Sequence, residues 1–237
     1  MKALLKTLIC TGLCLLPLSS VHGGFGFYAN SGSFILLDFG NGNEYFHLGP
    51  SSAGDPAFQG TRLNAFNLEN GGPIPFRVGF DKLTLNGFQN YTFENSGDNV
   101  LSGNLSYRVY RVGETPGEFN TLGWDSFTSL GGGNERHENV DANIDLLGPM
   151  PESGEYILEA FAWAEVDYGD GGPLDDIVWA GPSGNIFQSA GGSAPIGIFQ
   201  SSLSVERLPE PSTVGLLGLG VALLRVVRNK KPLQVEE

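Results

Sequence analysis

The hydrophobic and polar positions in the central part of the chain alternate as they do in extended strands. From Tyr156 the sequence reads Tyr-Ile-Leu-Glu-Ala-Phe-Ala-Trp-Ala-Glu-Val-Asp. Successive side chains of a strand point to opposite faces, so one face of this segment carries Tyr156, Leu158, Ala160, Ala162, Ala164 and Val166. Residues 156–167 are therefore expected to form one long strand.

Other segments with a similar pattern predict further strands, at residues 34–39, 74–80, 89–93, 99–112, 138–146, 176–180 and 196–206. Turn-forming pairs separate them, among them Asn86-Gly87, Gly71-Gly72 and Gly171-Gly172. No window of this region shows a sustained helical stripe. The pattern predicts an all-β fold, specifically a single antiparallel β-sandwich of the jelly-roll or immunoglobulin-like kind.

Two local patterns refine this picture. Tyr156 enters its strand after a Pro/Gly turn, where sandwich folds often place a corner tyrosine. A plain core aromatic is the equal alternative for Tyr156. The segment Glu135-Arg-His-Glu138 follows Gly131-Gly-Gly133 and is expected to be an exposed loop.

The N-terminus has the layout of a secretory signal peptide. Lys2 and Lys6 precede an apolar run that ends near Leu18, and small and polar residues follow up to Gly23. The apolar run is too short to span a bilayer stably. We therefore assign residues 1–23 to a signal peptide. Its removal would take away both cysteines, Cys10 and Cys14, and leave no disulfide or thiolate in the exported chain.

The C-terminus, residues 209–237, has three parts in a fixed order. Pro209-Glu210-Pro211 comes first and cannot join a helix. A Gly-punctuated apolar run follows from Val214 to Leu224, and we expect it to form a short transmembrane helix. The cluster Arg225, Arg228, Lys230 and Lys231 comes last, and such basic residues hold a tail on the cytoplasmic side.

This three-part order resembles the PEP-CTERM sorting signal, which exosortases recognise in Gram-negative bacteria. The resemblance implies export by the general secretion machinery and a transient anchor in the inner membrane. It further implies cleavage by an exosortase near Pro209-Glu210-Pro211 and delivery to the cell surface or the extracellular polymer. It covers only the tail and says nothing of residues 24–208, which we take as one domain.

Composition excludes one class of partner for that domain. Residues 24–208 hold 23 Asp or Glu against 7 Lys or Arg, a formal charge of −16, and they hold every Phe, Tyr and Trp of the chain. The aromatic content indicates a folded core and not a disordered polyanion. A nucleic-acid binder needs clustered basic residues, so we expect no nucleic-acid partner.

Motifs for catalysis are missing from the same region. It contains two histidines, His47 and His137, and no Gly-x-Ser-x-Gly, His-Glu-x-x-His or dinucleotide-binding Gly-x-Gly-x-x-Gly motif. We therefore expect no enzymatic activity, with a two-carboxylate glycan-active enzyme as the less favoured alternative.

The sequence nevertheless offers two candidate surface sites. The second face of strand 156–167 carries Phe161 and Trp163 between Glu159 and Glu165, a combination that can stack and hydrogen-bond a sugar ring. The alternative places Phe161 and Trp163 in the core between the sheets. The second candidate site is a calcium site, for which an acidic, Gly-rich loop offers Asp167, Asp170, Asp175 and Asp176. A solvated acidic loop is the alternative there, and no other cofactor is expected.

Together these observations predict an exported protein with a structural or adhesive role at the cell surface or in an exopolysaccharide matrix. The alternative is an extracellular carbohydrate-binding module.

Overall fold

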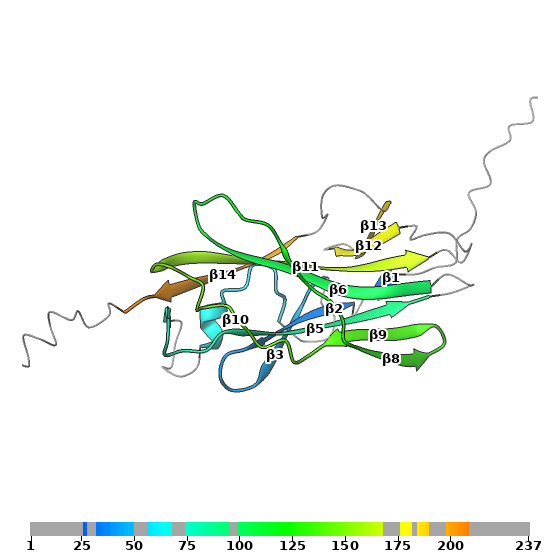
Figure 1. The fold of residues 1–237 in the computed structure, drawn as a ribbon, viewed down its shortest axis with the longest axis horizontal. Helices are drawn as coiled ribbons and strands as arrows, with labels where there is room; N and C mark the ends of the chain where they lie inside the picture. The colour runs from blue at the N-terminus through cyan, green and yellow to red at the C-terminus, as the bar shows by residue number, and fades with distance from the viewer. Residues whose placement is uncertain are drawn as a thin grey trace, which may run out of the picture.

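The computed structural model describes residues 26–27, 32–49, 56–67, 74–94, 99–167, 176–181, 184–189 and 198–208. Within these ranges the chain is nearly all strand, with one short 3-10 helix, η1 (Leu63–Phe66). The prediction of an all-β fold is confirmed, and the strands form two sheets (Figure 1). The jelly-roll or immunoglobulin-like arrangement stays a prediction, as does the division of the chain into one domain and two signals.

The first sheet is built around β5 (Thr84–Phe93) and is antiparallel throughout. Its strand order is β3 (Asn43–His47), β2 (Ser33–Asp38), β5, β9 (Asn134–Asn139) and β8 (Ser126–Gly131). Two short strands also pair with β5, namely β1 (Gly26–Phe27) and β10 (Ile144–Asp145).

The second sheet is built around the longest strand, β11 (Gly154–Asp167). One edge of β11 pairs along its length with β6 (Asn99–Arg111), which also pairs with β7 (Asn120–Leu122). The other edge pairs first with β14 (Phe199–Glu206) and then with β12 (Asp176–Gly181). The sheet is completed by β13 (Gly184–Ser189) beside β12 and by β4 (Phe76–Arg77), which runs parallel to β14.

One hydrophobic core draws side chains from both sheets. The face of β11 expected to be apolar lies in it, together with Ile35, Phe46 and Phe88 of the first sheet. The alanines at the centre of β11, Ala160, Ala162 and Ala164, belong to this same core cluster. The predicted face of this strand is thus confirmed. The alternative that placed Phe161 and Trp163 between the sheets is wrong, since they project from the other face of β11.

Several predicted boundaries needed correction. The segment expected to be a strand at 138–146 is split into β9 and β10, and the strand expected at 74–80 shrinks to β4. The predictions at 34–39, 99–112 and 196–206 match β2, β6 and β14 to within a few residues. The edge strands β3 and β8 were not predicted.

The Asn86-Gly87 pair is not a turn but a bulge inside β5, where the pairing with β2 shifts register. Gly87 has a φ of +142°, and a Cβ added there would lie 1.7 Å from the carbonyl oxygen of Asn139. Only glycine permits this approach of β9 to β5.

The segment Glu135-Arg-His-Glu138 is not an exposed loop, because it lies in β9 with Glu135 and His137 buried. Gly131, Gly132 and Gly133 all have positive φ and form the hairpin that leads into it. Tyr156 is buried in the core, and its hydroxyl also donates to the carbonyl oxygen of Glu152, 2.8 Å away. A bond to the backbone a few residues upstream is the geometry of a corner tyrosine.

Candidate functional sites

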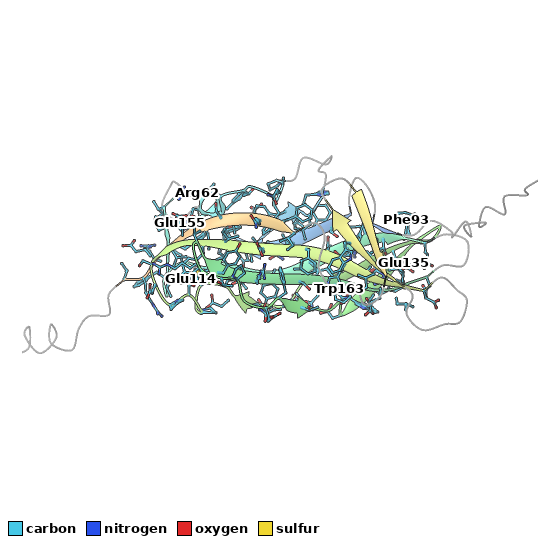
Figure 2. All side chains as sticks on the ribbon, turned by 90° about the horizontal axis from the view of Figure 1, so that it is seen from above. Arg62, Phe93, Glu114, Glu135, Glu155 and Trp163 are labelled. Carbon is cyan, nitrogen blue, oxygen red and sulfur yellow. The ribbon has the colours of Figure 1, made fainter. Side chains whose placement is uncertain are left out.

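The outer face of β11 carries the residues of the predicted sugar platform, and a loop covers part of them. Phe161 is only 4% exposed, since its ring packs edge-on against Phe119, 4.8 Å between centroids, and lies 5.0 Å from Trp179. Trp163 is half-buried, and its indole N–H donates to the hydroxyl of Ser106 (Figure 2). Of the two aromatic side chains, Trp163 is the one that reaches solvent.

The two carboxylates of the platform also differ in their exposure to solvent. Glu165 is half-buried, whereas Glu159 is 3% exposed. Glu159 accepts hydrogen bonds from Arg108 at 2.6 Å, from the Tyr110 hydroxyl at 2.8 Å and from the Gln200 amide at 2.6 Å. Its carboxylate oxygens are therefore occupied by the protein itself.

Arg108 fixes the loop that covers Phe161. Its guanidinium carbon lies 4.0 Å from the centroid of the Phe119 ring, and its Nη1 donates to the carbonyl of Gly117. Arg108 thus links a buried carboxylate, an aromatic ring and the loop backbone.

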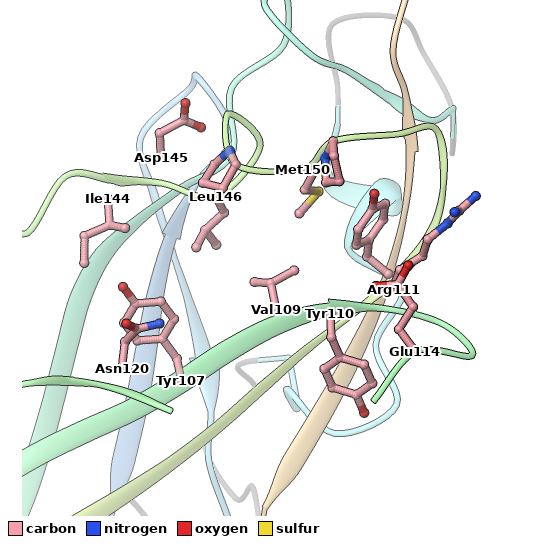
Figure 3. Close-up of a pocket in the computed structure, with 13 residues that line it drawn as sticks. Tyr107, Val109, Tyr110, Arg111, Glu114, Asn120, Ile144, Asp145, Leu146 and Met150 are labelled. Atoms are coloured by element: carbon pink, nitrogen blue, oxygen red, sulfur yellow. The ribbon is translucent and has the colours of Figure 1, made fainter. Parts of the chain in front are cut away.

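A cavity of about 270 Å³ lies between β6 and the segment that follows β10 (Figure 3). Tyr107 and Val109 project into it from β6, and Leu146 and Met150 face them from the other side. Asn120, Asp145 and Glu114 supply polar groups to its wall. The sequence alone does not reveal this cavity, because its walls come from segments that only the tertiary fold brings together.

Tyr107 is the polar group best placed to meet a ligand in this cavity. Its hydroxyl makes no hydrogen bond to any residue in the described part of the chain. Burial raises the pKa of the Tyr107 hydroxyl, which keeps it a neutral hydrogen-bond donor. By contrast, Asp145 is already engaged by the backbone N–H groups of Leu147 and Gly148.

A second polar cluster lies inside the fold, on β9. His137 Nε2 is 3.2 Å from Glu135 Oε2. The His137 ring packs against the rings of Trp124 and Phe127, with 5.3 Å between the ring centroids in each pair. Gly103 of β6 leaves room for His137, since a Cβ there would lie 2.7 Å from the Cβ of His137. Burial, together with the charge of Glu94, raises the pKa of Glu135 to about 7, and burial lowers the pKa of His137 to about 4. This pair holds a proton near neutral pH, but the protein covers both side chains.

Arg207, directly after β14, is held by two hydrogen bonds. After β14, the backbone N–H of Arg207 donates to the hydroxyl of Ser153, and its Nη1 donates to the carbonyl of Pro151. The next residue, Leu208, is 40% exposed. These hydrogen bonds fix the chain at Arg207, two residues before the tail begins at Pro209.

Comparison with models of known families finds a match to the PEP-CTERM protein-sorting motif over residues 208–231. This chain carries a PEP-CTERM sorting motif. The predicted resemblance is confirmed, and the motif indicates an exported exosortase substrate targeted to the cell surface. No curated protein and no solved structure matches the chain.

The PEP-CTERM motif itself lies outside the described residues from Pro209 on, and so do the predicted basic residues Arg225, Arg228, Lys230 and Lys231. The predicted signal peptide lies outside them as well. Within the residues that are described, no helix is long and apolar enough to cross a membrane.

The predicted calcium loop falls largely in undescribed residues too. Asp170 and Asp175 are outside the described ranges, and Asp167 and Asp176 are the last and first residues of strands that flank the gap. Among the described side chains, no three acidic, histidine or cysteine groups gather as metal ligands do.

Proposed function

We propose that this protein is exported, cleaved by an exosortase near Pro209-Glu210-Pro211, and delivered as an acidic β-sandwich with a structural or adhesive role. The cell surface or the exopolysaccharide matrix is its destination, and the role is not enzymatic. The observation that carries the proposal is the sorting motif at residues 208–231, which begins directly after Arg207, the hydrogen-bonded residue that follows β14. A motif joined so directly to a β-rich domain favours a protein whose folded part is itself the delivered cargo.

The test is the fate of the C-terminus in cells that contain an exosortase. Replacing Pro209, Glu210 and Pro211 by alanine is expected to abolish cleavage, so that a protein with its basic tail accumulates in the membrane fraction. Mass spectrometry of the C-terminal peptide measures this. The control is Pro232→Ala, which lies beyond the matched residues and should be processed normally. Equal processing of the parent protein in cells without exosortase contradicts the proposal.

A second candidate function is carbohydrate binding, and the cavity beside Tyr107 favours it. Its volume of about 270 Å³ lies just below the usual range of ligand pockets, about 300–1,000 Å³, and suits one ring better than a long ligand. A sugar ring can place its C–H face on the Tyr107 ring while its hydroxyls meet the Tyr107 hydroxyl and the Asn120 amide. At Trp163, by contrast, the neighbouring Phe161 and Glu159 are covered.

Glycan-binding measurements with oligosaccharides from the producer's own matrix test this candidate. Tyr107→Ala is expected to weaken binding about tenfold, an effect of about 1.4 kcal/mol. Tyr45→Ala, which removes a 37% exposed tyrosine elsewhere, should leave the affinity unchanged. A loss on Trp163→Ala and none on Tyr107→Ala would assign the site to the outer face of β11 instead. Failure of the parent protein to bind any oligosaccharide contradicts the candidate function.

A further inference from the structure

Three exposed apolar side chains gather at the end of the domain where β14 leads into the sorting motif. Phe80 is 67% exposed, Val112 is 55% exposed and Leu208 is 40% exposed. Large apolar side chains in such exposed positions are unremarkable singly, but a group of them at one place marks an interaction surface.

Backbone hydrogen bonds place all three beside the chain exit. In the turn that carries Phe80, the N–H of Val78 donates to the carbonyl of Glu206. On the other side, the N–H of Val112 donates to the carbonyl of Glu155. The strand ends of β4, β14, β11 and β6 therefore form a row across this end of the second sheet, with Phe80 and Val112 flanking Leu208.

The basic residues of the domain gather at the same end. Residues 24–208 contain seven Lys or Arg, and five of them lie here: Arg62, Arg77, Lys82, Arg111 and Arg207. Four are paired with carboxylates of the domain. Carboxylates also lie at this end, among them Glu114, Asp145 and Glu206, so the basic residues reduce its negative charge without cancelling it. Repulsion from anionic lipid headgroups is therefore weaker there than it would be without this cluster. Figure 2 shows Arg62 and Glu155 at this end, with Trp163 and Glu135 toward the opposite end.

Chain length limits how far this end can stand from a membrane. Six residue steps join Leu208 to Val214, where the apolar run begins, and they span at most about 22 Å when fully extended. The headgroup layer of one leaflet takes up roughly 5–7 Å of that distance. While the run is in the bilayer, the exit end of the domain lies within about 17 Å of the headgroup surface.

We propose that, before cleavage, this end of the domain rests on the bilayer, with Phe80, Val112 and Leu208 in the headgroup region. The inference rests on the proposed membrane-anchored intermediate and adds to it the face that meets the lipid. The short link raises the effective concentration of this face at the surface, so that three side chains with weak affinity of their own suffice. The stems of Arg77 and Lys82 lie beside Phe80 and can extend toward the headgroups.

Single cysteines test the proposal, because residues 24–237 contain none. Phe80→Cys, Val112→Cys and the control Leu130→Cys are labelled with an environment-sensitive dye. The control is 47% exposed and lies on β8, away from the exit. Each chain of residues 24–237 is reconstituted into phosphatidylethanolamine–phosphatidylglycerol vesicles that contain a lipid-bound quencher near the headgroups. We expect the labels at 80 and 112 to be quenched at least threefold more than the label at 130.

Vesicle flotation distinguishes a wrong membrane-facing surface from the absence of the membrane anchor. If the chain floats with the vesicles and the three labels are quenched equally, the anchor is present and the proposed face is wrong. If the chain does not float, the proposed membrane intermediate fails, and the inference fails with it.

Discussion

Arg108→Ala is expected to destabilise the protein by about 3–5 kcal/mol, because it leaves the buried carboxylate of Glu159 without a positive partner. The side chain of Glu159 is 4% exposed, and that of Arg108 is 20% exposed. Tyr110 and Gln200 still donate to Glu159, but neither carries charge. The substitution also removes the contact with Phe119 and the hydrogen bond to Gly117, so the loop over Phe161 should loosen.

Urea unfolding at neutral pH measures the effect against a matched control. Arg62→Ala breaks an ion pair in which both side chains are more than half exposed, and such pairs contribute about 0–1 kcal/mol. Adding Glu159→Gln to Arg108→Ala should restore part of the loss, because it removes the uncompensated charge. Equal free energies of unfolding for the two arginine variants would show that Glu159 is solvated, and the account of this face would be wrong.

The central strands could be predicted from sequence because burial decides their pattern. β11 is buried on its inner face along its whole length, and its alternation of apolar with larger or polar residues records that environment. The edge strands have a weaker hydrophobic pattern in the sequence. β8 reads Ser-Phe-Thr-Ser-Leu-Gly and is mostly exposed, so no apolar stripe distinguishes it from a loop.

The bulge at Asn86-Gly87 shows a second limit of prediction from sequence. Both a tight turn and a bulge use glycine at positive φ, so the pair alone does not distinguish them. The carbonyl of Asn139 decides between the two, and it lies more than fifty residues away in the chain.

The candidate sites also differ in whether the sequence alone predicts them. The sorting motif is linear and is read directly from the tail. Exposure of Phe161, by contrast, depends on Phe119, which arrives from a loop after β6, and the cavity at Tyr107 needs the segment after β10. Alternation places a side chain on a face of a strand, but it does not reveal which loop covers that face.

Glu135→Gln is expected to stabilise the protein at pH 8 and to change little at pH 4.5. Burial raises the pKa of Glu135 from 4.5 to about 7 in the folded protein. The native fold therefore favours the protonated acid, and the stability that this gives is complete below pH 4.5 and is lost as the pH rises through 7. Glutamine resembles the protonated acid and has no charge to bury, so the variant avoids this loss.

The magnitude follows from the size of the pKa displacement. At about 1.4 kcal/mol for each tenfold change in proton affinity, the upper limit of the stabilisation by Glu135→Gln is about 3 kcal/mol. Part of the Glu135 side chain, 12%, remains exposed, and solvent screening there reduces the expected gain at pH 8 to about 2 kcal/mol.

His137 acts in the opposite direction and must be separated from Glu135. Burial lowers its pKa to about 4, so the stability that it contributes is complete above pH 6.5 and is lost as the pH falls through 4. Both the parent protein and Glu135→Gln keep His137, so the difference between their free energies of unfolding isolates Glu135. Urea unfolding at half-unit steps from pH 4.5 to 8 should show this difference growing with pH. Glu118→Gln, on an exposed loop, is the control for the same substitution at the surface. A constant difference for Glu135→Gln would mean that Glu135 is ionised throughout, and that the pair on β9 does not hold its proton at neutral pH.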